Sequence, residues 1–160
     1  MVATTDRNGL IVLDRRACLE RLASRRVGTI ALTEGALPVA VPTVYTLFGT
    51  DVVISANPTS LLGRRLPDAI VSLCVQDVPD DLIGGWNVTI IGCAEIIQDP
   101  TVLDALPWDR LPSWGSAPLG PIGEAGGRVG SIVARLGTER VTGRVVPGNW
   151  RVERPAGRHR

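Results

Sequence analysis

Residues 42–62 read PTVYTLFGTDVVISANPTSLL and carry the clearest local structural signal in the chain. This stretch holds the end of one run rich in β-branched residues, 38–47, and the whole of a second, 52–56, with the turn sequence FGTD between them. Asn57 and Pro58 follow directly, and Asn is a preferred N-cap while Pro is a preferred first helical residue. The stretch therefore predicts a β-hairpin that leads straight into a short helix.

Similar short runs continue on both sides of the hairpin. Before it, Asp14 is a good N-cap for an amphipathic helix over residues 15–26. The other expected strands are 27–32, 69–76, 86–97, 127–135 and 141–146. Several links are as short as hairpin turns, which favours an antiparallel barrel or sandwich, because a parallel sheet would need crossover helices. The expected fold class is mainly β with short helices (α+β).

The chain has 160 residues, the size of one domain. We expect residues 14–147 to form that domain, with an N-terminal segment over 1–13 and an Arg-rich, flexible tail over 148–160. The 17 basic and 16 acidic residues leave a net charge of +1, too little to bind nucleic acid or an anionic membrane. Every basic residue except one histidine is arginine, and without lysine a Walker A loop and a pyridoxal-phosphate Schiff base are excluded.

The histidine and the cysteines restrict the chemistry further. His159 lies in the tail, which argues against a Ser-His-Asp or Cys-His catalytic unit. Cys18, Cys74 and Cys93 are widely spaced among apolar neighbours and are expected to be small buried residues, not metal ligands. Their odd number and an N-terminus unlike a signal peptide predict a cytoplasmic protein. No apolar run approaches the ~20 residues of a membrane span.

The predicted helix start is the clearest candidate for a binding site. A helix N-terminus presents unpaired N–H groups and a partial positive charge, and Thr59 and Ser60 add hydroxyl donors, so an anion such as a phosphate could bind there. Arg64 and Arg65 follow one turn later and could fold back towards the same anion. The alternative is an ordinary capped helix with two arginines facing the solvent.

Four stretches, taken in their order and spacing, carry a resemblance to a known family. They are Gly28-Thr29-Ile30-Ala31, residues 42–62, Gly85-Trp86-Asn87-Val88 and Thr142-Gly143-Arg144. Together they resemble the flavin-binding split-barrel family of pyridoxamine-phosphate-oxidase-like proteins. The resemblance implies a six-stranded antiparallel split β-barrel, a homodimer, and a flavin held between the subunits.

The resemblance also assigns residues to the cofactor. It implies a ring that lies along Pro42, Thr43, Val44 and Tyr45, with Trp86 near the interface, and a phosphate at Ser55, Asn57, Thr59 and Ser60. Four residues depart from the family pattern. Thr29 takes the place of an arginine, and Val44 takes the place of an asparagine. Ser55 stands where an arginine is often found, and Leu61 stands where a lysine is usual. The departures remove cations from the phosphate, and Arg64 and Arg65 are the residues that could replace them.

Three functions follow from the resemblance and its departures. The first is an FMN-binding oxidoreductase that transfers hydride or electrons to a small-molecule substrate, with the cofactor supplying the redox chemistry. The second is a reductase on the same barrel that uses a deazaflavin, coenzyme F-420. The third is a barrel without a cofactor that serves as a binding or structural dimer, and the missing cations favour it.

Two aromatic features remain open. Tyr45, the only tyrosine, is either the proton donor of a reductase or a residue of the core or interface. The loop 107–121 is rich in proline and carries Trp108 and Trp114. A long irregular loop is usually functional or disordered, and two large apolar rings argue against disorder. We expect one of these rings either to cover the cofactor cleft or the partner subunit, or to cap the barrel of its own chain.

Overall fold

The computed structural model describes residues 4–80, 83–111 and 130–148. In chain order the elements are β1 (Ile11–Leu13), α1 (Arg15–Ala23), β2 (Val27–Glu34), β3 (Leu37–Phe48), β4 (Asp51–Ala56), α2 (Leu61–Arg65), β5 (Ile70–Asp77), β6 (Gly85–Ile96), α3 (Pro100–Ala105), the 3-10 turn η1 (Trp108–Arg110), β7 (Ile132–Leu136) and β8 (Val141–Val146). No helix among these residues is long and apolar enough to cross a membrane.

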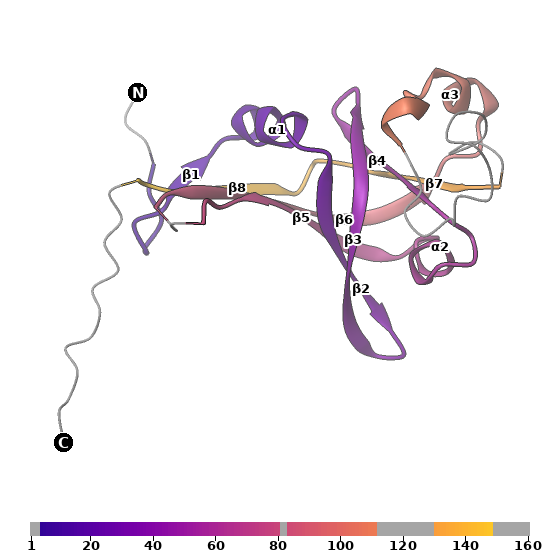
Figure 1. Ribbon diagram of the computed structural model, residues 1–160, viewed down its shortest axis with the longest axis horizontal. Coiled ribbons are helices and arrows are strands. Elements are labelled where there is room, and N and C mark those ends of the chain that lie inside the picture. The colour runs from indigo at the N-terminus through magenta and orange to yellow at the C-terminus, as the bar shows by residue number, and fades with distance from the viewer. Residues whose placement is uncertain (1–3, 81–82, 112–129, 149–160) are drawn as a thin grey trace.

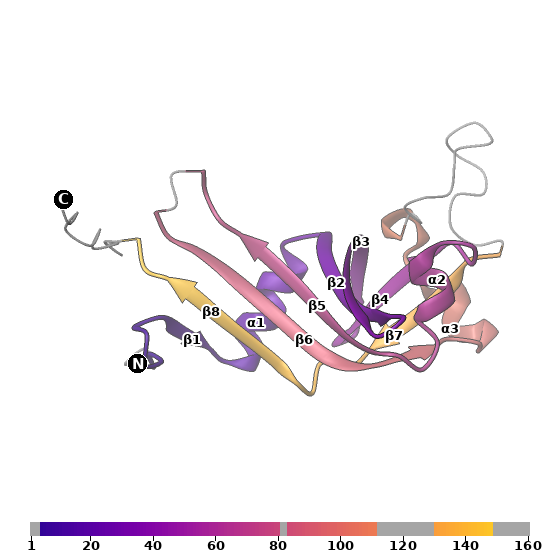
Figure 2. The ribbon, with the colours of Figure 1, turned by 90° about the horizontal axis from the view of Figure 1, so that it is seen from below.

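The strands form one antiparallel sheet that closes into a six-stranded barrel. The order β6-β5-β2-β3-β4-β7 returns to its start because β6 pairs with β7 as well as with β5. Along its other edge, the long strand β6 has two partners in turn. Its first half pairs with β8, and its last residues, Ala94 to Ile96, pair with β7. Strands β8 and β1 therefore extend the sheet beyond the barrel (Figures 1 and 2). The split barrel expected from the sequence is confirmed.

Alternation along the strands builds the core. In β2, Gly28, Ile30 and Leu32 are buried while the residues between them are exposed, which is the period of two of a half-buried strand. The main core inside the barrel includes Ile30, Ile54, Leu73 and Ile90, each at most 1% exposed. Helices α1 and α2 add buried side chains to it: Cys18, Leu22, Leu62 and Leu66.

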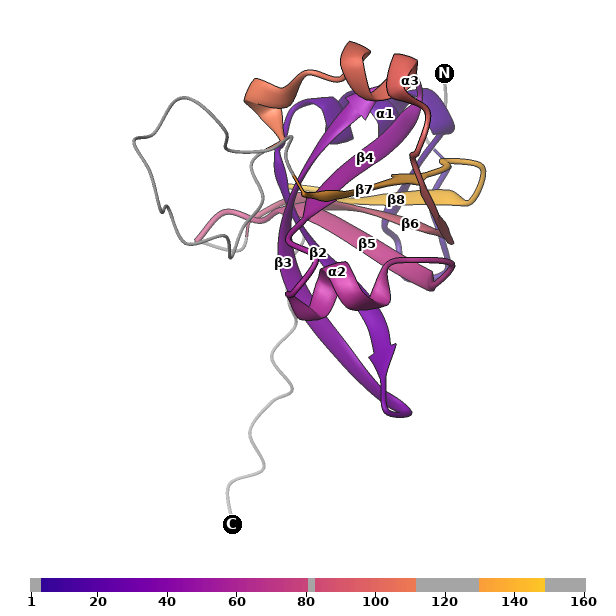
Figure 3. The same ribbon diagram turned by 90° about the vertical axis from the view of Figure 1, so that its right-hand side faces the viewer.

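A second, smaller cluster lies on the outer face of β4 and β7. It consists of Val53, Leu106, Leu111 and Val133, with Trp108 packed against it. These residues join α3 and η1 to the outside of the barrel. Figure 3 shows α3 and α2 on either side of β4 and β7. Most of the outer face of β4 is thereby removed from solvent.

The start of the helix after β4 differs from the expectation. Ser60, not Asn57, is the N-cap of α2: its Oγ accepts the N–H of Gly63 at 3.0 Å. The Asn57 side chain instead accepts the N–H of Thr59 at 2.9 Å and closes a turn before the helix. Asn favours this local turn as strongly as it favours a cap, and a serine three residues later supplies the better-placed oxygen.

Other boundaries also shift. Helix α1 ends at Ala23, and the chain turns into β2 through Ser24, whose N–H bonds to the carbonyl of Arg21. Strand β7 is 132–136, and part of the expected strand 127–135 lies outside the described residues. The pairing of β1 with β8 and the η1 turn carried no sequence signal, because three residues are too few to show a period.

Candidate functional site

A cavity of about 450 Å³ lies on the outer face of the barrel where β2, β3 and β5 adjoin. It is lined by Val27, Gly28, Thr29, Pro42, Cys74 and Gln76. None of these residues has a charged side chain at neutral pH, and the polar ones are Thr29, Cys74 and Gln76. The cavity is thus a shallow site for a flat, mostly apolar group that needs a few hydrogen bonds.

The cavity belongs to a wider surface without charge. Strand register puts Thr29 beside Pro42 on one side and Cys74 on the other, and Cys74 beside Thr89. The next row repeats the pattern and consists of Ala40, Ala31, Ser72 and Ile91. We call these eight residues the uncharged face. Ile91 is 42% exposed on it, and Ile70, close by on β5, is 69% exposed. Exposed apolar surface of this kind is typical of an interaction site.

The residues expected to line a ring do not share one face. Pro42 is exposed on the uncharged face, whereas Thr43, Val44 and Tyr45 are buried at 2%, 5% and 1% exposure. Tyr45 belongs to the core inside the barrel, and its hydroxyl donates to the carbonyl of Leu22 at 2.7 Å. Burial raises the pKa of the Tyr45 hydroxyl. Tyr45 is therefore a core residue and no proton donor to a ligand on the outer face.

Replacing Tyr45 with phenylalanine tests this role. The change removes the short bond to the carbonyl of Leu22, which keeps only the longer bond from the N–H of Arg25 at 3.3 Å, so the free energy of unfolding should fall by about 1 kcal/mol. Urea denaturation measures the fall, and a reading unchanged within error would contradict the buried bond. Because the hydroxyl is remote from the outer cavity, ligand binding to the folded variant should not change.

At the expected phosphate end, most donors already have partners. The N–H of Thr59 and its Oγ1 both bond to the side chain of Asn57, at 2.9 and 2.8 Å. The N–H of Ser60 bonds to the carbonyl of Asn57 at 3.0 Å. Ser55 is 3% exposed on β4. The amides of Thr59 and Ser60 are therefore used within the turn that precedes α2, and Arg64 and Arg65 are the side-chain cations that follow it.

Two such cations lie side by side on α2, and both are exposed. Arg64 donates to the carbonyl of Thr59, and Arg65 forms an ion pair with Glu34 at the end of β2. The Arg65 guanidinium lowers the pKa of the Glu34 carboxyl below its usual value. Glu34 is thus ionised at neutral pH and competes with any other anion for Arg65. Sequence reasoning missed this contact, which joins residues far apart in the chain.

The tryptophans take structural positions. Trp86 is 6% exposed in the main core, and the Arg21 guanidinium lies 5.4 Å from its ring centre. The Trp108 indole donates to the carbonyl of Leu103 at 2.8 Å and packs on the outer cluster. Trp108 therefore covers the barrel of its own chain, the second of the two expectations. Trp114 lies outside the described residues.

Sequence reasoning also missed Val27 and, on β5, Cys74 and Gln76, which line the cavity. The signal was present, because residues 70–77 read IVSLCVQD and alternate between apolar and mostly polar positions. A nearly apolar run of this kind also fits a strand buried on both faces. One face is exposed, and it carries Ser72, Cys74 and Gln76 at or beside the cavity.

Comparisons with known proteins agree with this architecture. Residues 14–118, more than half of the chain, match the model of the family described as pyridoxamine 5'-phosphate oxidase. No match was found among curated proteins.

Three solved structures illustrate the likeness. The FAD binding protein from Mycobacterium smegmatis is 16% identical with a TM-score of 0.62, over 86% of this chain and 98% of its own. A FAD-binding protein from Mesorhizobium loti is 20% identical with a TM-score of 0.60, over 86% and 98%. The FAD and heme binding protein from Mycobacterium smegmatis is 21% identical with a TM-score of 0.61, over 88% and 71%. At such identities the likeness concerns the fold.

Proposed function

Because the chain belongs to the pyridoxamine 5'-phosphate oxidase family, we propose that it is a homodimeric flavin-binding oxidoreductase that acts on a small-molecule substrate. The observation that carries the proposal is the uncharged cavity among β2, β3 and β5, which includes two of the positions named by the resemblance, Thr29 and Pro42. The FAD-binding names of the structural neighbours point to the same class of ligand.

The residues present fit the ring of a flavin. Val27 and Pro42 offer apolar contact to one of its faces, and Thr29 and Gln76 offer a hydroxyl and an amide for its polar edge. The cavity is open on its outer side, so a second copy of the chain is needed to cover the other face of the ring.

The residues present fit the phosphate of a flavin less well than its ring. Arg64 donates to the carbonyl of Thr59 at the expected position, and Arg65, next to it on α2, must share or exchange its contact with Glu34. Strand β2 connects the two parts: Glu34 lies five residues after Thr29, or roughly 17 Å along an extended strand. FMN and FAD have the ring and the ribityl phosphate in common, so the proposal covers both, and FMN is the form implied by the resemblance.

When bound, the flavin supplies hydride or electron transfer, and the chain supplies binding and orientation. Thr29 and Gln76 orient the ring edge, while Pro42 and Val27 exclude water from the face that they cover. Because the hydroxyl of Tyr45 is buried and bonded to Leu22, a proton that the substrate needs must come from another source.

The proposed dimer brings together two copies of the uncharged face. A two-fold axis places the same surface on both subunits, which suits a face built from small neutral side chains. Ile70 and Ile91 would lose their solvent exposure in this contact, and the cavity beside Cys74 would be closed by the partner.

Titration with three cofactors tests the proposal. We expect FMN or FAD to bind the purified protein, with a shift of the flavin absorbance and quenching of its fluorescence, and deazaflavin F-420 to bind more weakly. Tighter binding of the deazaflavin would change the cofactor assignment to the second function. If none of the three binds at micromolar concentration, the flavin proposal fails.

Substitutions of Glu34 and of the two arginines on α2 should change the affinity for FMN in opposite directions. Replacing Glu34 with glutamine releases Arg65, so FMN should bind about tenfold more tightly, whereas Arg64→Ala combined with Arg65→Ala should weaken it by tenfold or more. Glu20→Gln, which removes an exposed carboxylate paired with Arg16 on α1, is the matched control and should change nothing. Equal affinity in all variants would place the phosphate elsewhere.

A dimer without a cofactor is the second candidate, and one observation favours it. The amides of Thr59 and Ser60, just before α2, are bonded within the turn, and Arg65 already has an anionic partner. A protein of this kind would dimerise through the uncharged face and bind none of the three cofactors. The titration above, read together with the mass of the assembly, separates the two candidates.

A further inference from the structure

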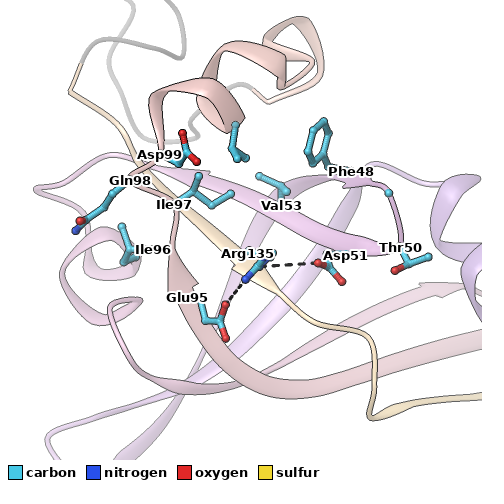
Figure 4. Close-up of a pocket in the computed structure, with 12 residues that line it drawn as sticks. Phe48, Thr50, Asp51, Val53, Glu95, Ile96, Ile97, Gln98, Asp99 and Arg135 are labelled. Atoms are coloured by element: carbon cyan, nitrogen blue, oxygen red, sulfur yellow. Dashed lines mark hydrogen bonds and ion pairs between the residues drawn. The ribbon is translucent and has the colours of Figure 1, made fainter.

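A second and larger cavity lies at the other side of the barrel, between the β3–β4 turn, the end of β6 and the start of α3. Its volume is about 720 Å³, within the range of small-molecule sites in proteins. It is lined by residues 48–51, Val53, 95–99, Val102 and Arg135 (Figure 4). It has no lining residue in common with the cavity proposed for the flavin, so the two sites are separate.

One part of the cavity is apolar. Val53, fully buried on β4, and Ile97, which packs against the same outer cluster, line it. Val102 on α3 and Phe48 at the end of β3 add further apolar surface, and Phe48 is 37% exposed. A ring or short alkyl body would cover Phe48 and remove its apolar surface from water, which favours binding.

The charged part of the cavity is dominated by carboxylates. Arg135 donates to Glu95 at 2.5 Å and lies 3.8 Å from the Asp51 carboxylate, so that it stands between the two in Figure 4. These carboxylates raise the pKa of the Arg135 guanidinium, with a contribution from Glu139. Asp99 completes the lining and caps α3 by accepting the N–H of Thr101 at 2.8 Å.

The balance of charge decides which ligand this cavity suits. Three carboxylates, Asp51, Glu95 and Asp99, line it against the single guanidinium of Arg135, and Glu139 lies in an adjoining cavity. An anionic ligand would meet a surplus of negative charge. A bare metal ion is disfavoured too, because no group of three possible ligands is positioned to hold one among the described residues.

We infer that this cavity binds a small organic cation, an ammonium group that carries an apolar or aromatic body. The body packs on Phe48, Val53 and Ile97, and the ammonium lies beside the carboxylates of Asp51 and Glu95, which have oxygen acceptors beyond their contact with Arg135. The inference does not depend on the flavin, because it uses none of the residues proposed to hold it.

The test compares, on the full chain, two probes that share the same phenylethyl body and carry opposite charges. 2-Phenylethylammonium and its anionic counterpart 3-phenylpropionate are titrated by calorimetry at low and at high salt. We expect the cation to bind at least about tenfold more tightly than the anion and to weaken as salt screens the carboxylates. Equal affinity of the two probes, or no binding of the cation at millimolar concentration, would overturn the inference.

Variants then place the cation in this cavity. Glu95→Gln should weaken binding of 2-phenylethylammonium several-fold, and Phe48→Ala should weaken the binding of its ring. Glu20→Gln on α1 removes an exposed carboxylate elsewhere and should leave the affinity unchanged. An equal loss in Glu20→Gln and Glu95→Gln would show attraction by overall charge and no site, which would also overturn the inference.

Discussion

Replacing Ala31 with glutamate is expected to dissociate the proposed dimer into monomers. Ala31 is exposed at the centre of the uncharged face, between Ala40 on β3 and Ser72 on β5. A two-fold interface contains the substituted residue of both subunits. Two carboxylates would therefore be buried and desolvated there with no cation to pair with. We expect the dissociation constant to rise by about 100-fold or more, equivalent to about 3 kcal/mol.

The measurement is the mass of the assembly by light scattering or sedimentation over a range of concentrations. Ala23→Glu is the matched control, because Ala23 is an exposed alanine at the end of α1 and away from the uncharged face. The thermal midpoint of Ala31→Glu should stay near that of a monomeric reference, since the side chain points to solvent in the isolated barrel. A dimer of unchanged affinity would move the interface to another surface, and a wild-type monomer would remove it altogether.

Replacing Gly63 with alanine is expected to be the most destabilising single-methyl change in α2. An added Cβ would lie 2.0 Å from the carbonyl oxygen of Asn57 and 2.9 Å from Cα of Pro58. Both are backbone atoms, so the helix itself must move, and Leu62 and Leu66 move with it out of the main core. We expect the free energy of unfolding to fall by about 3 kcal/mol, the upper part of the range for overpacking.

Urea denaturation of the two glycine variants provides the comparison. Gly148→Ala is the control, because an added Cβ there meets no atom within 4 Å, and it should change stability by at most about 0.5 kcal/mol. If Gly63→Ala is as stable as the control, α2 does not pack against residues 57–58 as described. Arg64 and Arg65 lie on the same turn, so anion binding should decrease together with stability.

The local sequence was sufficient for the strands and for the outline of the barrel. Alternating burial from Val27 to Glu34, and the glycine turn between β3 and β4, are properties of neighbouring residues. Their order gave an antiparallel sheet because the short links leave no room for crossovers. The same local reasoning failed at the start of α2, where Asn57 and Ser60 compete for one role and both choices satisfy the local chain.

The candidate site was predicted less completely than the fold. Pro42 and Thr29 were named by the family resemblance, and both line one cavity. Cys74 and Gln76 reach that cavity from β5, more than thirty residues further along the chain, through strand pairing alone. The contact of Arg65 with Glu34 likewise depends on where α2 packs. A pattern that spans a few neighbouring residues cannot predict contacts between residues so far apart in the sequence.

The sequence alone therefore indicated every strand except β1, their antiparallel pairing, and a composition with no lysine and a single histidine. Those properties follow from side-chain period, turn residues and composition, which act over a few positions. Three further features became visible in the folded chain: β6 closes the barrel by pairing with β7, Tyr45 faces inward to Leu22, and particular side chains share each cavity. These features depend on how segments far apart in the sequence pack together. A close-packed core accepts only side chains that fit the available space, and that fit is not encoded in any short stretch.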